Sequence, residues 1–172
     1  YPSGAAQQSL LASKIFNVMP EHIAVGNGAA ELIASLAKFV EGTVAIPFPT
    51  FNEYPERFTS VRVVPVPTDM ETFSYSVDDI IDTVKKEQAK ATVLINPDNP
   101  TGNFLEKADV LRLCAELKKT GTLLFFDESF IDFAEKSRRY TLLDENILNE
   151  YPNLIVVKSI SKSSVSYTHL TL

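Results

Sequence analysis

Three polar residues that lie far apart in the sequence could together act on a cationic aromatic ring. Lys162 follows Ser-Ile-Ser, and its amine could form a Schiff base with an aldehyde. Asp127 follows the apolar run 123–126, where a carboxylate could pair with a ring nitrogen. Asn99 lies in the Asn-Pro-Asp-Asn-Pro-Thr-Gly segment 96–102, where its amide could donate to a phenolate oxygen. These three functions are parts of a pyridoxal phosphate site.

Each of these motifs also has a purely structural interpretation. The 96–102 segment would make a turn in any protein, and a carboxylate after a strand can be a surface terminus. Segment 159–162 can be a serine-rich loop with a surface lysine. In the functional interpretation, the hydroxyl groups of Ser159 and Ser161 hold a phosphate and Lys162 becomes a general base.

Two further segments could contact the same ligand. Gly28, Ala29 and Ala30 lie at a strand-to-helix turn, and free N–H groups at a helix start bind phosphate. The alternative is an ordinary tight turn, because neither a P-loop nor a full G-x-G-x-x-G is present. Phe51 could stack on a ring, or it could be a core residue.

The spacing of apolar residues predicts alternating strands and helices. The strands are expected near 22–25, 43–46, 61–66, 91–95, 122–126 and 154–158, and the helices near 5–16, 29–40, 52–58, 77–86 and 106–119. This alternation indicates one α/β domain with a mostly parallel sheet covered by helices on both faces. Ligands of such sheets bind at the carboxyl ends of the strands, and the polar residues described above lie there.

Composition excludes several classes of function. The 172 residues are 45% hydrophobic and 22% charged, as in an ordinary soluble protein. The net charge of −6 argues against a nucleic-acid partner, and we find no apolar run of about 20 residues for a membrane span. We see no signal peptide, and the single cysteine, Cys114, fits a core position in a cytoplasmic protein. Two isolated histidines give no metal site.

Taken in order, the motifs resemble those of the fold type I pyridoxal phosphate enzymes. The similarity is to the class I/II aminotransferases, and within them to the branch of histidinol-phosphate aminotransferase and threonine-phosphate decarboxylase. The segments that carry it are 1–2, 26–31, 49–51, 96–102, 127–133 and 159–162. The resemblance implies that residues 1–164 are part of a large cofactor-binding domain.

The resemblance also implies individual functions. Lys162 would be the Schiff-base lysine, Asp127 would pair with the pyridinium nitrogen, and Asn99 would contact the ring hydroxyl. Phe51 would stack on the ring. Tyr1 would reach the phosphate of a neighbouring subunit, which implies a homodimer. The residues implied to hold the phosphate are Ala29, Ala30, Ser159 and Ser161.

Two features depart from the family pattern. Phe130 stands in the cofactor-binding position where aminotransferases usually have a tyrosine, and the surrounding Asp-Glu-x-Phe-Ile-Asp-Phe is closer to threonine-phosphate decarboxylases. After Ser164 the family's Gly-Leu-Arg is missing, and Val165–Leu172 looks like a translated transposon-end sequencing adapter. We therefore expect 165–172 to be non-native, with a divergent tail as the alternative, and the start at Tyr1 to be truncated.

For the intact parent, these observations predict an aminotransferase that acts on an amino acid or amino-phosphate. The alternatives are a decarboxylase of a phosphorylated amino acid and a non-catalytic α/β binding module. The present chain alone is expected to be inactive or nearly so, and poorly stable.

Overall fold

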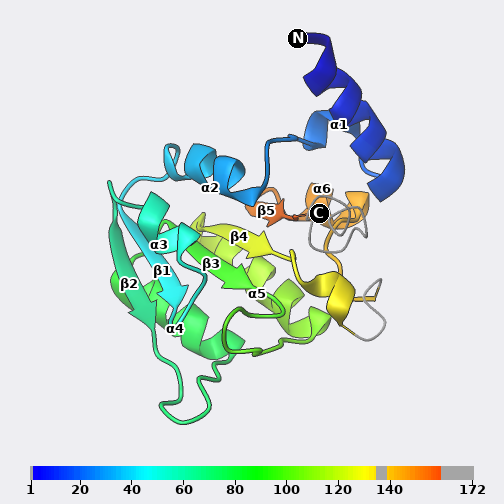
Figure 1. Ribbon diagram of the computed structural model, residues 1–172. Helices are drawn as coiled ribbons and strands as arrows, with labels where there is room; N and C mark the ends of the chain where they lie inside the picture. Colours follow the sequence, from blue (N-terminus) through cyan, green and yellow to red (C-terminus); the bar gives the residue numbers. More distant parts are fainter. Residues whose placement is uncertain (1, 135–138, 160–172) are drawn as a thin grey trace, which may run out of the picture.

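A five-stranded parallel sheet forms the centre of the computed structural model, which describes residues 2–134 and 139–159 (Figure 1). The strand order is β2-β1-β3-β4-β5, and every neighbouring pair is parallel. The strands are β1 (Thr43–Pro47), β2 (Arg62–Val66), β3 (Ala91–Ile95), β4 (Leu123–Asp127) and β5 (Leu154–Val157). The predicted α/β class and parallel sheet are confirmed.

The helices begin and end at residues suited to those positions. The α4 helix starts with a reciprocal capping box between Ser76 and Asp79, and α5 ends at Gly121, whose φ of 68° suits a residue without a Cβ. The helices are α1 (Pro2–Phe16), α2 (Ala29–Ala37), α3 (Glu53–Arg57), α4 (Val77–Glu87), α5 (Lys107–Thr120) and α6 (Glu145–Glu150), with short 3₁₀ turns η1 (Pro20–His22) and η2 (Ile131–Phe133).

The two faces of the sheet have separate apolar cores. Phe125 of β4 packs on the face covered by α2 and α3, whereas Phe126 packs on the face covered by α4 and α5. Cys114 lies fully buried in the second core, as predicted, and burial raises the pKa of its thiol to about 12. Because successive side chains of a strand point to opposite faces, Asp127 lies on the same face of the sheet as Phe125, and Glu128 lies on the same face as Phe126.

The predicted strand at 22–25 is wrong. The chain forms η1 and then runs irregularly into α2, although Ile23 has extended angles of φ −119° and ψ 126°. Extended geometry becomes a strand only when a neighbour completes the ladder, and no described residue pairs with this segment. The α2 helix also ends at Ala37, three residues before the predicted end, and α6 was not predicted.

The apolar spacing of α1 predicted a helix correctly, but its apolar residues do not enter a core. Leu10, Leu11 and Ile15 are 49%, 61% and 66% exposed. Figure 1 shows α1 standing away from the sheet.

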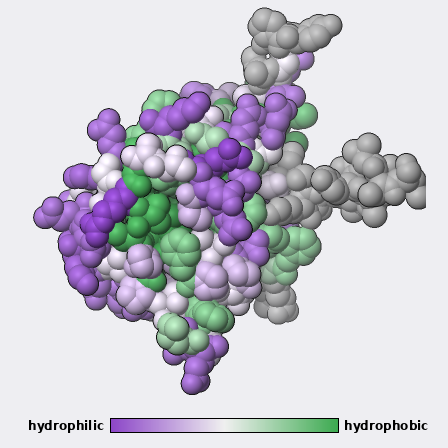
Figure 2. Space-filling model, turned by 60° about the vertical axis from the view of Figure 1, so that its left-hand side comes forward, coloured by the Kyte–Doolittle hydropathy of each residue, from purple (hydrophilic) through white to green (hydrophobic). Residues whose placement is uncertain are grey.

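In Figure 2, apolar residues also gather in one patch bordered by hydrophilic residues. Within residues 2–134 and 139–159, no helix is long and apolar enough to cross a membrane.

Candidate active site

The carboxyl ends of the parallel strands lie at one edge of the sheet. Phe51 follows β1, Asn99 follows β3, Asp127 ends β4 and Ser159 follows β5. We call these four residues the strand-end site. Tyr1, Ser161 and Lys162, which were also predicted to contribute, lie outside the described residues.

Asp127 is buried, at 3% exposure, and both of its carboxylate oxygens accept hydrogen bonds. The backbone N–H of Ser129 donates to Oδ1 at 2.9 Å. The phenol of Tyr54, on α3, donates to Oδ2 at 2.8 Å. A buried carboxylate needs such partners, and each oxygen keeps a further lone pair. Asp127 is therefore a fixed acceptor rather than the surface terminus of the alternative interpretation.

The loop after β3 is held by its own polar side chains. The buried amide of Asn96 bridges to Leu105, accepting from its N–H at 2.8 Å and donating to its carbonyl at 2.9 Å. Asp98 accepts from the backbone N–H of Asn99 and from the hydroxyl of Thr101, while burial raises the pKa of the Asp98 carboxyl. The half-buried side chain of Asn99 hydrogen-bonds to no described residue, so its amide is open to a ligand.

The end of β5 is joined to the end of β4. The backbone N–H of Ser159 donates to Oγ of Ser129 at 3.0 Å. On the other face of the sheet, Nζ of Lys158 lies 3.5 Å from Oε1 of Glu128 and 3.2 Å from Oδ2 of Asp132. These contacts fix the carboxyl end of β5 relative to β4.

Glu128 is fully buried next to Asp127 in the sequence, but its side chain makes its contacts on the opposite face of the sheet. Its carboxylate accepts from the hydroxyl of Thr141 at 2.7 and 3.0 Å and from the N–H of Leu142 at 3.0 Å. Burial raises the pKa of Glu128, although the hydrogen bonds and Lys158 oppose that effect. This network anchors the loop after β4 and was not predicted.

The predicted phosphate segment begins α2. Gly28 precedes the helix with a φ of 86°, which favours glycine, and Ala29 and Ala30 form the first turn. The carboxylate of Glu31 already accepts a hydrogen bond from the N–H of Asn27 at this turn. Phe51 is half-buried and packs against the α2/α3 core, so its contacts include those of the structural interpretation.

Phe130 and Asn99 line the same shallow hollow, which has a volume of about 310 Å³. The rings of Phe130 and Phe133 lie 6.3 Å apart between centroids. The other lining residues are Pro97, Asp98 and Ala134. Two of the predicted cofactor-binding residues thus border one space at the strand ends.

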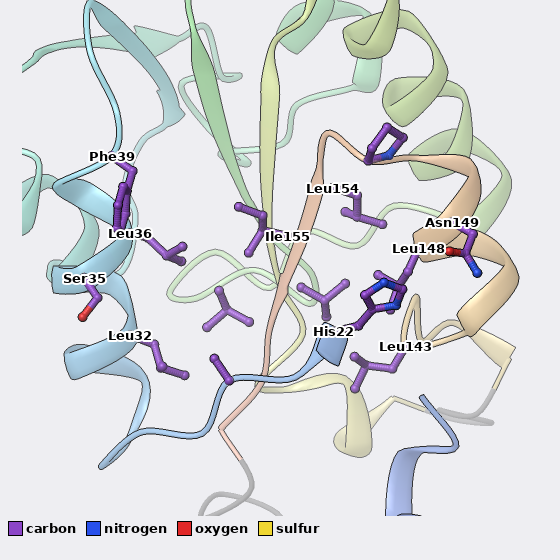
Figure 3. Close-up of a pocket in the computed structure, with 14 residues that line it drawn as sticks. His22, Leu32, Ser35, Leu36, Phe39, Leu143, Leu148, Asn149, Leu154 and Ile155 are labelled. Atoms are coloured by element: carbon purple, nitrogen blue, oxygen red, sulfur yellow. The ribbon is translucent and has the colours of Figure 1, made fainter. Parts of the chain in front are cut away.

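A larger hollow of about 630 Å³ lies elsewhere, beside β5 between α2 and α6 (Figure 3). We call it the β5 groove. Its walls are mainly apolar, with Leu36 from α2, Leu148 from α6 and Ile155 from β5 turned into it, and His22 at its side. It contains no described residue that was predicted for the site. No group of His, Cys, Asp and Glu among the described residues could hold a metal ion.

The sequence profile of the family described as aminotransferase class I and II matches residues 5–168. The chain belongs to this family. It is 36% identical over 170 residues to L-serine phosphate decarboxylase of Sulfurospirillum multivorans, covering 94% of this chain and 42% of that protein. It is 34% identical to a histidinol-phosphate aminotransferase of Thermoanaerobacter pseudethanolicus, over 85% of this chain and 40% of that protein.

Solved structures agree with this membership. The structure of a decarboxylase from Sulfurospirillum multivorans matches with a TM-score of 0.79 and 34% identity, over 94% of this chain and 42% of that one. Histidinol-phosphate aminotransferase from Sinorhizobium meliloti, in complex with pyridoxal-5′-phosphate, has the same fold, with a TM-score of 0.76 and 24% identity over 91% and 42%. The predicted family is confirmed, and with it pyridoxal phosphate as the cofactor of this aminotransferase-family chain.

The chain spans about 42% of the length of these relatives. Tyr54, which reaches Asp127 from a different element, was not predicted as a site residue. The local cue is one of spacing: Tyr54 comes three residues after Phe51, and its backbone N–H donates to the Phe51 carbonyl where α3 begins.

Proposed function

We propose that the intact protein is a pyridoxal phosphate-dependent enzyme that transfers the amino group of an amino acid or amino-phosphate. The observation that carries the proposal is the buried carboxylate of Asp127, held at the end of β4 by two donors in a chain of this family. A positively charged ring nitrogen is the partner that would balance such a carboxylate.

The described residues fit the cofactor. Asp127 would accept from its ring nitrogen, and the open amide of Asn99 would donate to its ring hydroxyl. The N–H groups at the start of α2, after Gly28, and the region of Ser159 would take its phosphate, and Phe51 would border its ring. When bound, the cofactor supplies an electron sink for charge at the substrate Cα. Lys162 would hold it and then move the Cα proton.

Decarboxylation of a phosphorylated amino acid is the second candidate. It is favoured by Phe130, which stands where aminotransferases usually have a tyrosine. The 36% identity to L-serine phosphate decarboxylase supports the same candidate. A phenyl ring cannot donate a hydrogen bond to the ring hydroxyl of the cofactor. The amide of Asn99 would then be the main donor to that hydroxyl.

Several further sequence predictions remain proposals. We propose that the enzyme is a cytoplasmic homodimer in which Tyr1 reaches the partner's site. We also propose that residues 1–164 belong to the large cofactor-binding domain and that 165–172 are non-native. The last proposal is that the 172-residue chain alone has little or no turnover. A measurable half-reaction with an amino donor would contradict it.

A cofactor titration tests the proposal. The visible absorbance of bound pyridoxal phosphate should develop in the 172-residue chain and be lost in Lys162→Ala. Lys85→Ala, which changes an exposed lysine on α4, is the control and should behave like the unchanged chain. Failure of the unchanged chain to bind would favour the non-catalytic binding module. In the intact protein with serine phosphate as donor, carbon dioxide would indicate decarboxylation, and a carbonyl product without it would indicate transamination.

A further inference from the structure

The contact between Tyr54 and Asp127 joins α3 to the strand-end site. Tyr54 is 1% exposed, and its hydroxyl lies 2.8 Å from Oδ2 of Asp127. The two residues are separated by 73 positions in the sequence, so only the packing of α3 over the sheet brings them together.

A second contact fixes that packing. Phe58, the residue that follows the last residue of α3, lies 5.9 Å from Phe125 between ring centroids. Four helical residues rise about 6 Å, and two strand residues span about 6.6 Å. The pair Tyr54 and Phe58 therefore matches the pair Asp127 and Phe125 in spacing. The phenol hydroxyl is thus held at the carboxylate by the register of the helix on the strand.

The hydroxyl remains a donor under all ordinary conditions. Burial raises the pKa of Tyr54 well above its ordinary value, and the charge of Asp127 raises it further. The N–H of Ser129 fixes the other oxygen of the same carboxylate. With one donor on each oxygen, the plane of the carboxylate is set before any ligand arrives.

We propose that Tyr54 is a positioning residue for the cofactor: its hydroxyl orients the Asp127 carboxylate toward the ring nitrogen of pyridoxal phosphate. This inference rests on the proposed function, since it needs the cofactor to bind at Asp127. It adds a residue from α3 whose effect on the cofactor passes through Asp127 and depends on the ring nitrogen.

The test compares two ligands, pyridoxal phosphate and its 1-deaza analogue, in which a C–H group replaces the ring nitrogen. Tyr54→Phe keeps the ring and removes only the hydroxyl. It should weaken binding of pyridoxal phosphate about tenfold, as expected for one hydrogen bond to a charged group. Binding of the deaza analogue should change less than twofold. Tyr151→Phe, which removes a phenol beyond the amino end of β5, should change neither affinity.

An equal loss for both ligands, or no loss for either, would overturn the inference and leave the proposed function standing. Absence of binding by the unchanged chain would overturn both. If Tyr54→Phe does not fold, the same change can be made in Asp127→Asn, which lacks the buried charge that needs the phenol. The double variant and Asp127→Asn should then bind the cofactor with equal affinity. A weaker affinity of the double variant would show that Tyr54 acts on the cofactor by a route other than Asp127.

Discussion

The strand-end site and the β5 groove lie on the same sheet but have opposite chemistry. At the strand ends, buried polar groups such as Asp127 and Asn96 are held by hydrogen bonds. The β5 groove, at about 630 Å³, has twice the volume of the 310 Å³ hollow that Asn99 and Phe130 line beside this site, and its walls are mainly aliphatic. The larger hollow is therefore not where the predicted chemistry lies, and fixed polar groups identify the site better than volume does.

The position of β5 at one edge of the five described strands explains part of this difference. Lys158 and Glu128 close the carboxyl end of β5 with charges, whereas Leu154 and Ile155 along the strand face the groove. At the opposite edge, β2 carries Pro65 and the exposed Arg62, which discourage pairing with another strand. The sheet is thus protected at one edge and apolar at the other.

The largest effect should come from removing the charge that balances Glu128. Lys158→Met leaves the buried carboxylate with a weaker set of partners, and we expect a loss of about 3 kcal/mol in the free energy of unfolding. Urea denaturation measures it. Lys85→Met, in an exposed pair with Glu116, should cost about 0.5 kcal/mol or less. Similar losses for both variants would show that the buried pair of Lys158 and Glu128 contributes no more than an exposed pair.

Asn96→Ala should have the next largest effect. It leaves the N–H and carbonyl of Leu105 without their partner at a partly buried position, which costs about 2 kcal/mol. Asn149→Ala at the β5 groove removes an exposed hydrogen bond to Glu145 and should change stability by about 0.5 kcal/mol or less. Thermal or urea unfolding of the two variants compares the regions directly, and equal costs would contradict the comparison.

A smaller effect concerns pH. Because burial raises the pKa of Glu128 above its ordinary value, the folded state binds its proton more tightly than the unfolded state. The contribution of Glu128 to the free energy of unfolding is fully present below its ordinary pKa and is lost as the pH rises through the raised pKa of the folded state. Between these two pKa values, Glu128→Gln should make the free energy of unfolding depend less on pH. Glu116, whose pKa is lowered chiefly by a hydrogen bond from Lys119, should contribute with the opposite sign. An unchanged slope in Glu128→Gln would refute the assignment.

The smallest effect on stability is expected at the groove. Phe39 is 82% exposed and lines the β5 groove, so Phe39→Ser should change the free energy of unfolding by about 0.5 kcal/mol or less. It should nevertheless lower the fluorescence of an apolar dye that binds exposed hydrophobic surface. Met70→Ser, at an 84% exposed position outside the groove, should leave the dye signal unchanged. A signal equally reduced by both would mean that the dye does not report the groove.

Much of the fold could be predicted because each β-strand carries its own short apolar run. Asp127 could be predicted as a site residue because it ends such a run. The contacts of Tyr54 with Asp127, and of Lys158 with Glu128, could not, because they depend on the register between elements that are distant in sequence. The strand at 22–25 was predicted wrongly for a related reason: local sequence specifies extended backbone, but a neighbouring strand must complete the ladder.

One measurement tests the central claim that the strand ends bind pyridoxal phosphate. The 172-residue chain is loaded with the cofactor and treated with borohydride, which fixes the cofactor to the lysine that holds it. Peptide mass mapping then locates the label. We predict a single labelled peptide containing Lys162, with the label absent in Lys162→Ala. Label at Lys158, or spread over exposed lysines such as Lys85 and Lys119, would contradict the account.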